Sequence, residues 1–143
     1  MRFFPPSTYL PFAAFAARAE INLGHRGDDE KFHDAFEVKA KLTLGTDSNG
    51  IAPLTEAVIV QVGTFATTIP AGSFTLKKGK FTFEGVINGV TLEAMIRPLI
   101  LGNDYQFTAE GRGVDLTGTV NPVTIGLTIG NDSGSTTVRA ERN

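Results

Sequence analysis

KFTFEGVINGVTLEAMIRP, residues 80–98, is the stretch that decides the fold. Asn88-Gly89 lies between two runs of alternating apolar residues, and Asn-Gly is the pair best suited to the two positive φ angles of a type I′ turn. A two-residue turn here predicts a β-hairpin in which Ile87 faces Val90. Counting outward from the turn gives the other pairs of one apolar face: Gly85 with Leu92, Phe83 with Ala94, and Phe81 with Ile96.

The second face of this hairpin is unusual, because it places Glu84 opposite Glu93 and Lys80 opposite Arg97. Like charges directly across two strands are destabilising, so we expect a basic side chain from an adjoining strand between the carboxylates. The candidates are Lys39, Lys41 and Arg112. A pair of carboxylates roughly 5 Å apart at Cβ could also bind a cation or serve a retaining glycosidase. A flat sheet face without aromatic platforms for a sugar favours the charge-neutralised alternative.

Composition sets the protein class. The chain has 143 residues, enough for one domain with its own core, and a net charge of −2 from 13 basic and 15 acidic residues. This balance argues against a nucleic-acid partner. The absence of cysteine excludes disulfides and thiolate metal sites, and no segment is long and apolar enough to predict a membrane-spanning helix.

Alternation with a period of two recurs along the rest of the chain, and no ten-residue amphipathic helix interrupts it. Nine or ten short strands at regular spacing predict an all-β fold, an antiparallel β-sandwich, with a flattened β-barrel as the alternative. A bulge or corner is expected in the glycine-rich residues 111–119. The predicted strands besides the hairpin are 17–23, 36–44, 56–63, 65–70, 73–76, 105–110, 123–129 and 138–140.

The first 16 residues form an apolar arm ahead of a single sandwich domain, residues 17–143. Pro5, Pro6 and Pro11 prevent one continuous helix. The arm is either derived from a secretory signal or packs on its own sandwich or on a neighbouring subunit. We favour packing, with an interface made by Phe3, Phe4, Tyr9, Leu10, Phe12 and Phe15.

Two groups of residues have the side chains of metal ligands. His25, Asp28, His33 and Asp34 lie in one polar loop and could bind zinc or a similar ion. Asp47, Asn49 and Asp132 lie in predicted turns, the last within residues 131–134, and could bind calcium if the loops meet. Turn formation explains these Asp and Asn residues equally well, because both side chains hydrogen-bond their own backbone.

Within residues 36–141, the runs FTFEGVINGVTLEAMIRPL and YQFTAEGRGVDLTGTVNPVTIGLTIGNDSGSTTVRAE resemble the β-rich modules of uncharacterised secreted or surface bacterial proteins. The resemblance implies an extracellular or cell-surface sandwich module. It implies no reaction.

These observations predict a noncatalytic structural or adhesive module that associates with itself or with a protein partner through the aromatic arm. A calcium- or carbohydrate-binding module is the alternative, and a hydrolase that uses Glu84 and Glu93 is the second alternative. The sequence contains no nucleophile elbow or phosphate-binding motif, so we assign no catalytic residue. We expect no cofactor other than possible calcium.

Overall fold

Apolar alternation along the chain builds two β-sheets in the computed structural model, which describes residues 9–24, 33–100 and 102–142. Within these ranges there are strands and connecting turns but no helix. The strands are β1 (Leu10–Pro11), β2 (Ala14–Asn22), β3 (Asp34–Thr43), β4 (Val58–Val62), β5 (Phe65–Ile69), β6 (Thr75–Lys77), β7 (Lys80–Ile87), β8 (Val90–Pro98), β9 (Asp104–Val114), β10 (Val123–Ile129), β11 (Asp132–Val138) and β12 (Glu141–Arg142).

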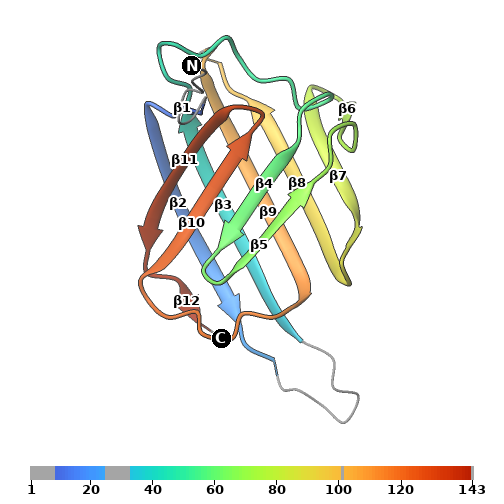
Figure 1. Ribbon diagram of the computed structural model, residues 1–143, viewed down its shortest axis with the longest axis vertical. Coiled ribbons are helices and arrows are strands. Elements are labelled where there is room, and N and C mark those ends of the chain that lie inside the picture. The colour runs from blue at the N-terminus through green and yellow to red at the C-terminus, as the bar shows by residue number, and fades with distance from the viewer. Residues whose placement is uncertain (1–8, 25–32, 101, 143) are drawn as a thin grey trace, which may run out of the picture.

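The strands form a five-stranded sheet in the order β1-β11-β10-β4-β5 and a seven-stranded sheet in the order β12-β2-β3-β9-β8-β7-β6 (Figure 1). Neighbouring strands are antiparallel, except that β1 pairs with β11 and β12 pairs with β2 in parallel. The sheets face each other across one apolar core and do not close into a barrel. The predicted all-β sandwich is therefore confirmed. The two-residue strands β1 and β12 were not predicted, since two residues show no periodicity.

The hairpin of residues 80–98 has the predicted register. Ile87 pairs with Val90, and the pairing continues outward to Phe81 and Ile96. Asn88 has a φ of 50° and Gly89 a φ of 82°, the two positive angles that the Asn-Gly turn requires. Local turn chemistry was enough to determine these pairs.

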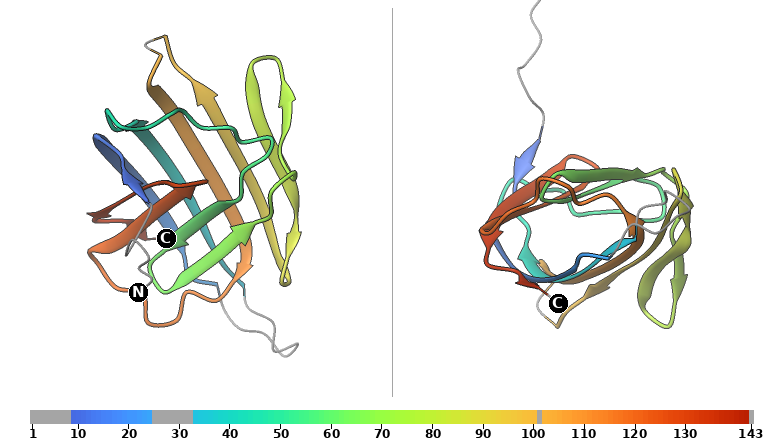
Figure 2. Two further views of the ribbon diagram at one scale, coloured as in Figure 1. Left: turned by 45° about the horizontal axis from the view of Figure 1, so that its top comes forward. Right: turned by 90° about the horizontal axis from the view of Figure 1, so that it is seen from below.

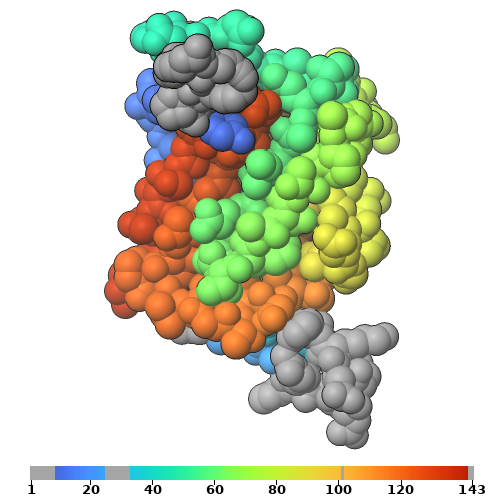
Figure 3. Space-filling model, viewed as in Figure 1, coloured from blue at the N-terminus to red at the C-terminus, as the bar shows by residue number. Residues whose placement is uncertain are grey.

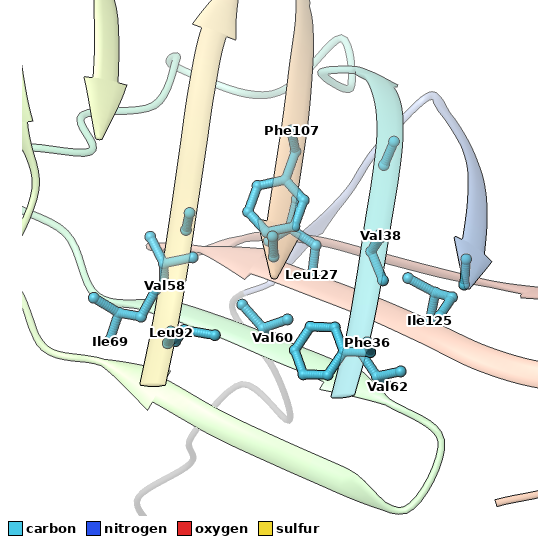
Figure 4. Packing of buried hydrophobic residues seen from close by; sticks show 14 of the residues in the cluster. Phe36, Val38, Val58, Val60, Val62, Ile69, Leu92, Phe107, Ile125 and Leu127 are labelled. Carbon is cyan, nitrogen blue, oxygen red and sulfur yellow. The ribbon is translucent and has the colours of Figure 1, made fainter. Parts of the chain in front are cut away.

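The core is built from the inward-facing residues of both sheets (Figure 4). Phe36 of β3 and Phe107 of β9 are almost fully buried, and they face Val60, Leu127 and other aliphatic side chains of the five-stranded sheet. Gly111 on β9 allows Phe36 to lie flat against the backbone, because a Cβ added at residue 111 would be 2.4 Å from the Phe36 ring. The predicted bulge is present here, since the register of β3 with β9 shifts between Asp34 and Ala35.

The first long strand begins earlier than predicted, at Ala14 instead of Ala17. Phe15, Ala17, Ala19 and Ile21 alternate toward the core, but the exposed residues Ala14 and Ala16 at the start of the strand are also small and apolar, which concealed this pattern in the sequence. Residues 10–16, which the sequence assigned to the arm, are thus paired into both sheets.

The predicted turn at residues 131–134 is wrong. Gly130, with a φ of 61°, and Asn131 make a shorter turn, and Asp132 already pairs with Ile129 as the first residue of β11. The glycine reverses the chain two residues earlier than the polar composition suggested. Asp132 consequently faces the core.

The two long sides of the sandwich differ (Figure 2). On one side β11 and β2, which belong to different sheets, contact each other. The structure shows no comparable contact of β5 with β6 or β7 on the other side. The sandwich is therefore closed at the β11 side and open at the β5 side. In the described ranges no helix could cross a membrane.

Candidate functional surfaces

A row of glutamates crosses the outer face of the seven-stranded sheet. The sequence predicted only the pairing of Glu84 with Glu93, and the structure confirms it. Each further strand adds another glutamate at the same level. The continuing pairs are Glu93 with Glu110, Glu110 with Glu37, Glu37 with Glu20, and Glu20 with Glu141.

The basic neighbour expected between Glu84 and Glu93 is absent from this row. The adjoining strand β9 places Glu110 there, because its register brings that residue directly opposite Glu93. The three basic candidates lie at other levels of the sheet. Lys39 lies between Thr108 and Arg18, Lys41 pairs with Gln106, and Arg112 pairs with Thr91.

Crowding of the carboxylates changes the acidity of the central one. The pKa of Glu110 is raised, first by a side-chain hydrogen bond with Glu37 and then by partial burial, by a hydrogen bond with Glu93 and by repulsion from both carboxylates. A shared proton relieves that repulsion, which favours the protonated form of Glu110.

A hollow of about 680 Å³ lies beside this row. Its lining combines carboxylates such as Glu93 with the short side chains of Thr82 and Thr108, and with Met95 and Lys77. Among the described residues that line the hollow, Phe83 is the one aromatic, and its ring packs against the core, so these residues offer no stacking platform for a sugar. The lining is thus polar and charged.

Two of the four residues of the predicted histidine-containing metal site, His25 and Asp28, lie outside the described residues. His33 is exposed. Asp34 has a structural role: its Oδ1 accepts from the Gly24 amide at 3.1 Å and its Oδ2 from the Leu116 amide at 2.9 Å. The two carboxylate oxygens therefore connect the start of β3 to Gly24 and to Leu116.

The calcium candidates differ in their surroundings. Asp47 and Asn49 are exposed in a turn, whereas Asp132 is completely buried. In the ranges that the structure describes, no three His, Asp or Glu side chains are grouped to hold a metal ion.

Asp132 is unusual because neither carboxylate oxygen has a hydrogen-bond partner. Its charge also acts on Tyr105, whose pKa is raised first by burial and then by Asp132. An unpaired buried carboxylate costs folding free energy, which makes this residue a weak point of the fold.

The candidate interface residues of the arm have separate roles. Phe3 and Phe4 lie outside the described residues, and Tyr9 is exposed. Leu10 belongs to β1, where its amide donates to the Asn131 carbonyl. Phe12 and Phe15 pack against the core with their ring centroids 5.6 Å apart.

The edge strand β5 is a candidate surface that the sequence did not reveal. It pairs with β4 on one side and is the last strand of its sheet. Residues 57–76, which include β4 and β5, carry no charged side chain. Charged residues are a common protection of exposed edges, so β5 lacks that protection. The missing charges could have indicated the edge, but only the topology shows that β5 is one.

The seven-stranded sheet extends beyond β5 (Figures 1 and 3). On its inner face, Phe81, Phe83 and Ile87 of β7 are only half-buried, and Leu76 of β6 is 54 % exposed. Phe74 covers part of this area, with its ring centroid 6.0 Å from that of Phe83. An open backbone edge and an incompletely covered apolar face thus adjoin each other.

In comparisons with known proteins, no family model, no curated protein and no solved structure matches this chain.

Proposed function

We propose that the protein is a noncatalytic self-assembling module, which accepts a strand from another copy at the open edge of β5. The observation that carries this proposal is the combination of the unprotected β5 edge with the half-covered apolar face of β6 and β7. A strand placed there would gain backbone hydrogen bonds and bury apolar surface at once.

The backbone of β5 offers its hydrogen-bonding groups at alternate residues. The Gly63-Thr64 turn makes Val62 and Phe65 a hydrogen-bonded pair, so the peptide groups of Ala66 and Thr68 point away from β4. The same rule holds at the opposite edge of the sheet. There the carbonyl of Ser133, one residue after the paired Asp132, accepts from the Phe12 amide at 2.8 Å.

The extension of the seven-stranded sheet beyond β5 allows a single strand to bind at the β5 edge but prevents the β5 edge of a second copy from binding there. Two β5 strands joined antiparallel would be related by a two-fold axis perpendicular to their sheet, which puts both seven-stranded sheets on the same side. The β6–β7 extensions of the two copies would then occupy the same space. A lone strand avoids this clash and lies over Phe81 and Phe83.

The donor that we propose is residues 1–8 of a neighbouring copy. Phe3 and Phe4 supply apolar side chains, and residues 1–8 contain a single charge, at Arg2. Eight extended residues reach at most about 29 Å, whereas a five-residue strand such as β5 spans about 17 Å. Pro5 and Pro6 limit ladder formation to the residues before them.

The donor and acceptor lie at opposite edges of one sheet. The described chain begins next to β1, at the β11 edge, and the acceptor is β5. Association is therefore head-to-tail, and such heterologous contacts form rings or open filaments.

Sedimentation velocity of the intact protein tests this proposal. We expect concentration-dependent oligomers that Thr68→Pro abolishes, because proline removes the outward amide of residue 68 without removing a bond to β4. Thr137→Pro is the matched control: residue 137 is an exposed threonine whose amide points outward at the other edge of the same sheet. This variant should oligomerise like the parent.

A second measurement uses the protein without residues 1–8 and a synthetic peptide of those residues. The peptide should bind and slow hydrogen exchange of the Ala66 and Thr68 amides. Oligomers of undiminished size in Thr68→Pro, or a peptide that protects neither amide, would overturn the proposal.

A further inference from the structure

The outer face of the seven-stranded sheet carries its charges in a pattern that repeats from strand to strand. On β8, Glu93 and Arg97 point to the same face four residues apart. The same spacing separates the charged residues of β3 and β7, which are Glu37 with Lys41 and Glu84 with Lys80. On the central strand β9, Glu110 has the amide Gln106 at that spacing.

Because neighbouring strands are in register, these residues form two rows across the sheet. The acidic row contains the glutamates described above, and the second row contains Lys41, Gln106 and Arg97. Lys80 lies next to this row on β7, one residue beyond the Phe81–Ile96 pair that ends the β7–β8 ladder. Four residues of a strand place the rows about 13 Å apart. A middle row lies between them and contains Arg18, Lys39, Thr108, Met95 and Thr82.

If two copies are related by a two-fold axis along the middle row, acidic residues of one copy lie opposite basic residues of the other. Rotation about that axis brings a second copy face to face and places each acidic row opposite the partner's second row. Glu110 and Glu20 then face the neutral residues Gln106 and Ala16 of the other copy. Strand β8 then pairs Glu93 with the partner's Arg97. Strand β3 pairs Glu37 with the partner's Lys41, and β7 pairs Glu84 with the partner's Lys80.

The charges needed for this contact are not neutralised within one chain. No salt bridge joins Glu37, Glu84 or Glu93 to a basic group in the described ranges, and Lys41, Lys80 and Arg97 are exposed. Arg97 donates only to the neutral oxygen of Gln106. The carboxylates raise one another's energy, as the raised pKa of Glu110 shows. A facing basic row would relieve that repulsion.

We propose that this face binds a second copy of the chain in a two-fold, salt-sensitive dimer. The interface is distinct from the β5 edge and does not depend on strand exchange. The hollow over Thr82 and Thr108 lies between the rows, so the contact encloses water, as polar interfaces commonly do. Two repulsive contacts are built in, since Lys39 and its neighbour Arg18 each meet their own counterpart near the axis.

Charge reversal tests the pattern in a Thr68→Pro background, where the β5 edge is blocked and a failure here is separate from a failure of strand exchange. Sedimentation at low ionic strength should show a dimer that dissociates as salt rises. Glu93→Lys and Arg97→Glu should each weaken it about 10-fold or more, because each reversal acts twice in a two-fold dimer.

Mixing the two variants gives the decisive result. A Glu93→Lys copy carries two basic groups on β8 and an Arg97→Glu copy carries two acidic groups, so the mixture should form a heterodimer that neither variant forms alone. The doubly reversed chain should dimerise like the parent, and Lys39→Thr should tighten the dimer. Circular dichroism checks the fold of every variant. A monomeric parent at low salt, or a mixture that does not associate, would overturn the proposal.

Discussion

Glu110 on β9 lies directly opposite Glu37 on β3, and a side-chain hydrogen bond with Glu37 is the largest cause of the raised pKa of Glu110. This pair is the centre of a carboxylate row that extends across six strands. Direct cross-strand pairing of like charges is sufficient to produce this effect.

The first prediction concerns Glu110 and pH. A carboxyl with a folded-state pKa above its ordinary value of 4.5 favours the folded protein when protonated, so this stabilisation is lost as pH rises through the folded pKa. Glu110→Gln should therefore raise the melting temperature at pH 7 and have little effect below about pH 4, where both states of the parent are protonated. An equal effect at both pH values would contradict this origin.

The second prediction concerns Asp132. Asp132→Val replaces an unpartnered buried carboxylate with an apolar, strand-favouring side chain, and should raise the free energy of unfolding by about 1–3 kcal/mol. Urea unfolding measures this change. The same variant should lower the pKa of Tyr105 only partly, since burial is the larger cause of its shift. In a Tyr9→Phe background Tyr105 is the one remaining tyrosine, so its pKa can be measured by spectroscopic titration. An unchanged Tyr105 pKa in Asp132→Val would contradict the influence of Asp132.

The third prediction concerns the packing of Phe36 on Gly111. Gly111→Ala puts a methyl group where the Phe36 ring lies, and overpacking of this kind costs about 1–3 kcal/mol. Gly102→Ala is the control, because nothing lies within 4 Å of the added Cβ and no positive φ is required there. Comparable losses of stability in the two variants would show that the Phe36 contact is unimportant.

The fourth prediction separates the two aromatic residues of the proposed donor strand. Successive side chains of a strand face opposite sides, so only one of Phe3 and Phe4 can cover Phe81 and Phe83 of the neighbouring copy. Phe3→Ser and Phe4→Ser should weaken oligomers to clearly different extents in sedimentation experiments. Equal effects would argue against a docked strand and for an unstructured apolar contact.

The sequence predicted best where local chemistry acts alone. Asn88-Gly89 defines its turn through two positive φ angles, and that turn determines the pairing of Glu84 with Glu93. Prediction was wrong at residues 131–134, where Gly130 turns the chain earlier and Asp132 becomes a core residue. Several polar residues in succession indicated a turn but could not place it.

Localisation, metal binding and the role of the arm stay predictions. The structure adds two surfaces that the sequence did not predict, the complete glutamate row and the open edge of β5. No local pattern identifies Glu20, Glu37 and Glu110 as neighbours of Glu93, because strands distant in the chain bring them together. Their alignment depends on matching the apolar faces of β2, β3, β8 and β9 over one core.

By itself the sequence determined the fold class, the central hairpin and the alternation that separates core from surface, because each depends on residues close together in the chain. Only the tertiary structure decided which strand is left at an open edge and which charges form rows. Those features depend on strand order and long-range register, and these are set when whole sheets bury their apolar faces together.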